Sequence, residues 1–227
     1  ALQFYTLALF SRLPGQSLSF DSLKLLNVLQ GGLTLPVLYW MTVVVLGPER
    51  RRLAVIAGLC VAALVAVSYW HITLSRLGER IVLTPLFVSL FIITFTRALR
   101  GNRLWDYILT GVVLGVGLYT YQVIRLLPVV VIAGAGIAVI FHWQHKRGLR
   151  RMLINTVILA FVAFMIFVPL FAYSLEYPQD FWRRTSGRLF GDDITQTTDA
   201  EGRLVSREAT LGDRLTAFGE NMPQLTT

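Results

Sequence analysis

Arginines beside aromatic and hydroxyl side chains are the residues of this chain best suited to carry chemistry. The guanidinium group presents a rigid fork of N–H donors that matches the oxygens of a phosphate. An arginine close to hydrocarbon is costly unless it reaches water or binds an anion. For Arg76 and Arg125 together we favour the anionic head group of a lipid, with interfacial anchoring as the alternative for any single arginine. The candidate binding residues are Arg76, Arg125, His71, Ser75, Arg80, Tyr119, Tyr121 and Arg184.

Other reactive residue types give weaker signals. His71 follows a tryptophan, which favours an anchoring or hydrogen-bonding role, and no second histidine lies at metal-ligand spacing, so we predict no zinc site and assign no metal ligand. Glu79 stands between two arginines and is interpreted as a local ion pair. Asp192 and Asp193 form an acidic doublet in a polar stretch, where solvated carboxylates are expected. Cys60 is the single cysteine, which excludes a disulfide framework and a cysteine metal cluster.

The composition is that of a membrane protein. Of 227 residues, 55% are hydrophobic and only 15% are charged, and the mean hydropathy is +0.61. The net charge of +8 is unevenly spread, with 15 Lys/Arg against 4 Asp/Glu in residues 1–175 and 6 against 9 in residues 176–227. Because the basic excess belongs to the apolar part, the predicted partner is the lipid bilayer, and no nucleic acid is expected.

Charge-free windows predict the elements that must position these residues. The windows are 25–48, 53–75, 81–96, 107–124, 126–145 and 152–175. Since about 20 helical residues cross the hydrocarbon, each window is one span at most. We therefore predict an all-α, polytopic bundle of about six transmembrane helices over residues 23–175. Residues 1–22 are expected to form a helix on the outer surface, and residues 176–227 an extracytoplasmic polar region. Because the first residue is Ala and no signal segment precedes the spans, we expect a fragment of a longer protein.

Basic residues predict the orientation of the bundle. One set of three connections carries ten Lys/Arg, at residues 50–52, 97–103 and 146–151, whereas the alternate connections carry three, Arg76, Arg80 and Arg125. Cytoplasmic loops hold the excess of basic residues. The first set is therefore predicted to be cytoplasmic, and the candidate binding residues to face outward.

Two further features concern packing and the tail. Residues 70–80 separate two apolar runs and are predicted to be a polar hinge. Small residues offer faces for close helix packing or a kink, at Gly31, Gly32, Pro36, Gly111, Gly115 and Gly117. In the tail, residues 192–206 are predicted to be a solvent loop and residues 211–218 a second surface helix.

Several short motifs resemble a known family. They are Trp70-His71, Ser75-Arg76-Leu77-Gly78 with Arg80, Thr84-Pro85-Leu86-Phe87, Gly115-Val116-Gly117-Leu118-Tyr119-Thr120-Tyr121, Arg125-Leu126-Leu127-Pro128, and Glu176-Tyr177-Pro178-Gln179-Asp180-Phe181 with Arg184-Thr185-Ser186. Together they resemble the multispanning GT-C glycosyltransferases of the dolichyl-phosphate-mannose protein mannosyltransferase and aminoarabinose transferase type.

The resemblance implies an activity. A sugar would move from a polyprenyl-phosphate donor to a glycan, lipid or protein acceptor on the outer face of a cell membrane, here a bacterial plasma membrane. It implies no cofactor and leaves a divalent metal open. It also implies a general base, a carboxylate in an outer loop ahead of the segment that residues 1–22 resemble, so no catalytic residue is predicted within this chain.

Two other classes remain as alternatives. A transporter or flippase for a lipid-linked sugar would also line a polar path with arginines, but it should carry charged or helix-breaking residues in the middle of several spans. Apart from Gln30 and Pro36 such residues are sparse. A non-catalytic membrane scaffold is the third class.

Overall fold

The computed structural model describes residues 2–12, 18–142, 146–176, 194–198 and 204–208, with only the backbone at several positions, Arg80 and Arg125 among them. The chain divides into two compact units, Ala1–Val168 and Pro169–Thr227. The predicted helix at 211–218, the acidic doublet at 192–193 and Arg184 lie outside the described residues.

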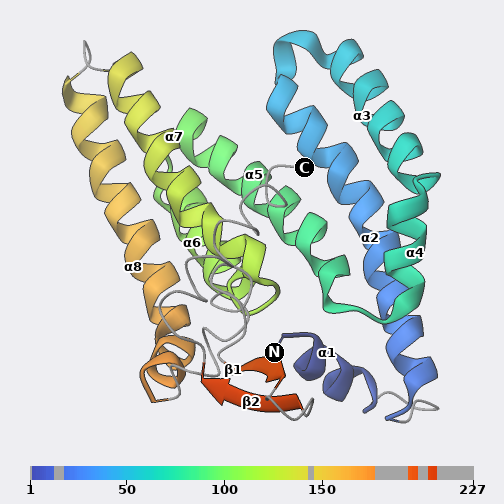
Figure 1. Ribbon diagram of the computed structural model, residues 1–227. Coiled ribbons are helices and arrows are strands. Elements are labelled where there is room, and N and C mark those ends of the chain that lie inside the picture. The colour runs from blue at the N-terminus through green and yellow to red at the C-terminus, as the bar shows by residue number, and fades with distance from the viewer. Residues whose placement is uncertain (1, 13–17, 143–145, 177–193, 199–203, 209–227) are drawn as a thin grey trace. The chain divides into compact units, whose positions relative to one another are not determined.

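Helices dominate the described residues, which confirms the all-α class (Figure 1). The α-helices are α1 (Leu2–Phe10), α2 (Phe20–Leu46), α3 (Arg51–Ala66), α4 (Tyr69–Leu77), α5 (Leu83–Gly101), α6 (Leu104–Gly117), α7 (Leu127–His142) and α8 (Lys146–Glu176). Three short 3-10 helices join them, η1 (Pro48–Arg50), η2 (Arg80–Val82) and η3 (Gln122–Leu126).

The second unit contains a strand pair. The strands β1 (Ile194–Thr198) and β2 (Leu204–Glu208) are antiparallel, with Ile194 opposite Glu208 and Thr198 opposite Leu204. The predicted solvent loop at 192–206 is therefore wrong for the paired residues. Four of the five residues in 194–198 are β-branched, which favours a strand.

In the described parts of the chain, three helices are long and apolar enough to cross a membrane, in the stretches Phe20–Leu46, Leu83–Gly101 and Leu149–Glu176. Pro48–Ala66 and Tyr69–Leu77 pass the same test as a pair, bent by 58°. Two shorter apolar helices cover Leu104–Gly117 and Leu127–Ile137. Every predicted window thus coincides with an apolar helix or with the bent pair, while the count of six spans stays a prediction.

The bent pair corrects the second predicted span. The window 53–75 is not one helix, because α3 ends at Ala66 and Ser68 adopts an extended backbone before α4 begins. Most of the predicted hinge at 70–80 is instead the helix α4. Gly78 caps the C-terminal end of this helix in the left-handed conformation, with φ of +78°. Glycine adopts this conformation without steric cost, so the residue suits a sharp helix end.

The core of the first unit lies between α5, α6, α7 and α8. Phe91 and Phe95 stack with ring centroids 5.3 Å apart, and buried Tyr107, Val131 and Leu159 complete the cluster around them. Such a core of facing helices, with apolar side chains also on the outer surfaces of α2, α3 and α7, is expected of a protein in lipid.

Glycines bring α6 and α8 together. A Cβ added at Gly111 would lie 2.7 Å from the carbonyl oxygen of Leu159, and one at Gly115 would lie 2.8 Å from Cβ of Ile166. The predicted close packing is confirmed at both positions, and at Gly31 against α4 and Gly117 against Ile124. Gly32 has open space around it, so its predicted packing role is wrong.

Alternate connections lie at opposite ends of the first unit (Figure 1). Gly47, Pro48, Gly101 and Arg103 line one pocket, which brings the α2–α3 and α5–α6 connections together. Asn155 of α8 donates to Asn102 Oδ1 at 3.2 Å and so joins α8 to this end. The connections with many arginines therefore share one end, as the predicted topology requires, whereas the side of the membrane on which they lie stays a prediction.

Candidate functional site

At the opposite end, α1 contacts both segments that carry the candidate arginines. The backbone N–H of Leu2 donates to the carbonyl of Tyr119 at 3.1 Å. The next residue, Gln3, donates through Nε2 to Asn27 Oδ1, and Asn27 Nδ2 donates to the carbonyl of Glu79 at 3.0 Å. Two successive residues of α1 therefore join the 119–125 segment to the 76–80 segment, with Asn27 of α2 as the intermediate.

Burial makes this connection firm. Gln3 is 4% exposed and Asn27 is fully buried. A buried amide in low dielectric is costly to leave unpaired. The aromatic neighbour Phe4, by contrast, is 69% exposed. α1 thus turns a polar residue inward and apolar ones outward, as suits a helix that lies against lipid.

Predicted site residues His71 and Ser75 face α2. His71 Nε2 lies 3.2 Å from the carbonyl oxygen of Gly31, and Ser75 Oγ donates to the carbonyl of His71 at 2.7 Å. Ser75 is buried against Gly31, where a Cβ would overlap its hydroxyl. The structure gives both residues a role in fixing α4 on α2, in agreement with the hydrogen-bonding histidine considered from the sequence.

The candidate arginines lie in or next to the backbone segments that these hydrogen bonds hold in place. Arg76 is exposed in the last turn of α4. Arg80 begins η2 and Arg125 lies in η3, and both 3-10 helices contact α5. At the η3 contact, Gly117 leaves room for two side chains, because a Cβ added there would lie 3.2 Å from Ile124 and 3.5 Å from Phe87. The backbones that carry Arg80 and Arg125 are thus held against the same helix.

Hydroxyl groups shape the 119–125 segment. Tyr119 donates its hydroxyl to the carbonyl of Ile166 in α8 at 2.7 Å, and Thr120 Oγ1 donates to the carbonyl of Gly117 at 2.6 Å. Tyr121 is half-buried with an extended backbone, from which η3 begins. Of the predicted polar neighbours, Tyr119 is therefore an anchor of the segment, while Tyr121 is partly open to solvent or lipid.

A polar stripe on α2 escaped the sequence interpretation. Asn27, Gln30 and Thr34 are buried on one face, whereas Val28 and Leu29 on the other face are exposed. The spacing of three and seven residues places them on one side of a helix. This spacing is the feature that could have identified them. The side-chain oxygens of Gln3 and Gln30 are buried and have no hydrogen-bond partner among the described residues.

Acidic groups at this end are few among the described residues. Asp21 and Glu79 are exposed, and the predicted ion pair of Glu79 is not formed with Arg76. Within the described parts of the chain, no group of three or more His, Cys, Asp or Glu side chains is arranged to hold a metal ion. Among the described residues, this end therefore combines the exposed Arg76 with the half-buried ring of Tyr121, residue types that suit an anionic ligand.

Comparison with protein-family models identifies a family over most of the chain. The family model described as dolichyl-phosphate-mannose-protein mannosyltransferase matches residues 2–173, which include all of α1 to α7 and most of α8. No curated protein matches significantly, and no solved structure does.

Proposed function

Because this chain belongs to the dolichyl-phosphate-mannose-protein mannosyltransferase family of membrane glycosyltransferases, we propose that it serves the transfer of a sugar from a polyprenyl-phosphate donor to a glycan, lipid or protein acceptor. We propose further that this transfer takes place on the extracytoplasmic face of a bacterial plasma membrane, which the chain crosses several times.

One observation supports the assignment of donor binding to particular residues. α1 joins the segments before Arg80 and Arg125 through Leu2, Gln3 and Asn27. Segments separated by about 40 residues of intervening helix are thereby kept at one end of the bundle. Charges carried by both segments can then act on a single phosphate.

The chemistry of the transfer explains why arginines would be needed there. As the sugar leaves its carrier, negative charge develops on the lipid phosphate. Pre-organised cations stabilise that charge, and the forked donors of arginine can engage two phosphate oxygens at once. Arg76, Arg80, Arg125 and Arg184 are the proposed phosphate ligands, with Tyr121 beside the donor. His71, Ser75 and Tyr119 are proposed to position these segments.

Donor binding tests the proposal without requiring transfer. Polyprenyl-phosphate mannose would be titrated against the chain in lipid nanodiscs, and the same titration repeated with Arg76→Ala and Arg125→Ala. Loss of one charge-assisted contact costs about 1.5–3 kcal/mol, so each variant should bind roughly 10- to 150-fold more weakly.

Arg12→Ala is the matched control, because Arg12 is an exposed arginine that follows α1 at the same end. It should bind the donor as the unchanged chain does. Unchanged affinity in both the Arg76 and the Arg125 variant, or an equal loss in the Arg12 control, would exclude the proposed phosphate site.

A further inference from the structure

A cavity of about 570 Å³ lies at the end of the first unit that is opposite to α1. Its apolar wall includes Val43 and Val44 at the end of α2. Its polar lining consists of Arg51, Arg97, Arg100, Arg103 and Asp106. Four guanidinium groups face one carboxylate, so the lining carries a formal charge of +3.

Arg100 fixes the wall of this cavity. Its Nη1 donates to the carbonyl of Val44 and its Nη2 to the carbonyl of Val45, both at 2.7 Å. The carbonyls of a final helical turn lack partners within the helix, and a cation there also favours the helix dipole. Gly47, with φ of +78°, leaves space for the guanidinium, because a Cβ there would lie 3.1 Å from Nη1.

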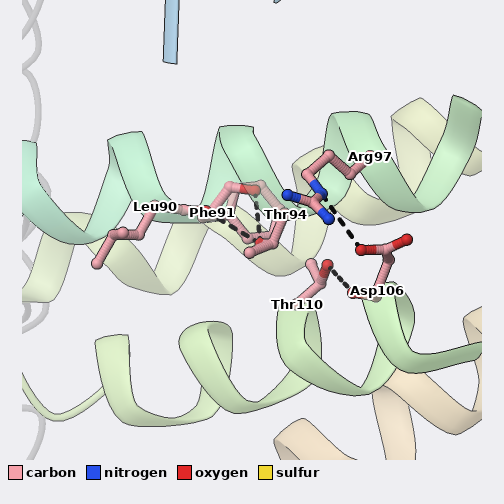
Figure 2. Close-up of polar contacts among 6 residues, drawn as sticks. All are labelled: Leu90, Phe91, Thr94, Arg97, Asp106 and Thr110. Atoms are coloured by element: carbon pink, nitrogen blue, oxygen red, sulfur yellow. Dashed lines mark hydrogen bonds and ion pairs between the residues drawn. The ribbon is translucent and has the colours of Figure 1, made fainter. Parts of the chain in front are cut away.

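Arg97 and Asp106 join α5 to α6 beside the cavity. Figure 2 shows the Arg97 side chain reaching from α5 toward the Asp106 carboxylate, with Nε 3.4 Å from Oδ1. The Asp106 side chain is 14% exposed, whereas that of Arg97 is 51% exposed. The contact uses one edge of the guanidinium and leaves the terminal nitrogens of Arg97 for another partner.

Arg51 and Arg103 have no such structural use among the described residues. Neither guanidinium group forms a hydrogen bond or ion pair with another described residue, and both residues are exposed. Arg51 begins α3 and Arg103 is the residue before α6. The N-terminal end of a helix carries partial positive charge, so arginine is unfavourable at both positions. An anion bound between them would turn this repulsion into attraction.

We propose that this cavity binds a phosphate-bearing anion, held by Arg51 and Arg103 and by the free nitrogens of Arg97. Arginine forks match phosphate oxygens, and the apolar wall of Val43 and Val44 suits a ligand with an attached hydrocarbon part. The cavity and the Asn27–Glu79 contact are separated by most of α2, about 28 Å at 1.5 Å per residue. The cavity is therefore separate from the proposed donor site.

Native mass spectrometry of the detergent-solubilised chain tests the proposal. Phosphatidylglycerol and the zwitterionic phosphatidylcholine would be titrated separately, and the bound fraction of each measured. The variant pair Arg51→Gln and Arg103→Gln removes the two guanidinium groups that have no hydrogen bond or ion pair to a described residue, and leaves the Arg97–Asp106 pair and the Arg100 contacts intact. Its affinity for phosphatidylglycerol should fall by about tenfold or more.

The matched control is the pair Arg150→Gln and Arg151→Gln. These exposed arginines lie in α8 and do not line the cavity. Removing them lowers the net charge equally, so a diffuse attraction would weaken equally in both pairs. Retained affinity in the control, together with loss in the cavity pair, would support a built site. Equal loss in both pairs, no loss in either, or equal affinity of unchanged protein for both lipids would overturn it.

Inorganic phosphate distinguishes two sources of the anion. Displacement of phosphatidylglycerol by millimolar phosphate would identify free phosphate as a ligand, whereas lipid binding that resists phosphate would identify the lipid head group. If the double variant loses its helical circular dichroism, Arg51→Gln alone serves the same comparison, because the Arg51 guanidinium forms no hydrogen bond or ion pair with a described residue. A loss of about threefold is then expected, since exposed charges contribute modestly.

Discussion

Asn27 Nδ2 donates to the backbone carbonyl of Glu79 at 3.0 Å across 52 residues of sequence. The same amide accepts a hydrogen bond from Gln3, so one buried side chain in α2 connects α1 to the turn that follows α4. A single substitution at position 27 should therefore loosen two separate segments.

Asn27→Leu keeps the size of the side chain and removes both hydrogen bonds. The Gln3 amide would be left buried without a partner, which costs about 1–3 kcal/mol, whereas the carbonyl of the exposed Glu79 can find water. We expect the free energy of unfolding to fall by about that amount, measured by denaturant titration in mixed micelles. Leu29→Ala, at an exposed position of the same helix, should change it by less than about 0.5 kcal/mol. Equal stability of Asn27→Leu and the unchanged chain would contradict the role of this contact.

Gly111→Ala should separate α6 from α8. The new Cβ would lie 2.7 Å from the Leu159 carbonyl oxygen, a backbone atom that cannot move without shifting its helix. Overpacking of this kind costs about 1–3 kcal/mol. Gly32→Ala is the control, because nothing lies within 4 Å of that position and alanine is the better helix former. The thermal midpoint should fall in the first variant and stay or rise in the second; the same response in both would count against close packing at Gly111.

Arg100→Ala should release the end of α2. Two hydrogen bonds to Val44 and Val45 are lost, each contributing about 0.5–1.5 kcal/mol in an exposed setting. Hydrogen exchange of the last turn of α2, measured by mass spectrometry, should accelerate while exchange in the core of α5 stays slow. Arg52→Ala, an exposed neighbour outside the cavity lining, should leave both rates unchanged. Unaltered exchange at 43–47 in Arg100→Ala would show that the contact does not hold the helix end.

The predicted orientation can be tested with cysteines at two exposed positions. In a Cys60→Ser background, Arg52→Cys and Leu18→Cys should react with a membrane-impermeant thiol reagent from opposite sides, because the connections with many arginines are predicted to be cytoplasmic. Reagent applied to intact cells should label position 18 alone, and labelling of both positions would exclude the topology.

Charge-preserving substitutions separate attraction from recognition at the proposed donor site. Arg76→Lys and Arg125→Lys keep the positive charge but lose the forked pair of donors. Donor affinity should fall between that of the unchanged chain and that of the alanine variants, by roughly threefold to tenfold in the titration described above. Lysine variants as weak as the alanine variants would show that the second donor of each fork is indispensable, and full rescue would show that charge alone suffices.

The helices were predictable because long apolar windows without charge admit few other structures. Family membership followed from the motifs around Ser75-Arg76 and Tyr119-Thr120-Tyr121, and it is confirmed. The break between α3 and α4 was not predictable, because Val67 and Ser68 are neither proline nor glycine, and the extended backbone at Ser68 depends on how α4 packs on α2. The strand pair was not predicted because its polar residues are as typical of a solvent-exposed loop as of a strand.

The site was only partly accessible to sequence reasoning. Arginines beside hydroxyl groups could be recognised from residue type. The packing of His71 and Ser75 on Gly31 could not, because Gly31 is 40 residues from His71 in the sequence. Asn27 and Gln3 carry no motif, since an amide in an apolar window gives no indication of its partner. The donor-binding assignments of Arg76, Arg80, Arg125 and Arg184 stay predictions.

The bend between α3 and α4 has a consequence for the lipid around it. An upright helix of 16 residues is about 24 Å long, shorter than the roughly 30 Å of a bilayer's hydrocarbon core. The exposed rings of Tyr69 and Trp70 at the bend would then lie about 6 Å below the level of the surrounding head groups. The bilayer beside the bend would have to thin for its head groups to meet these rings, so its surface would dip there.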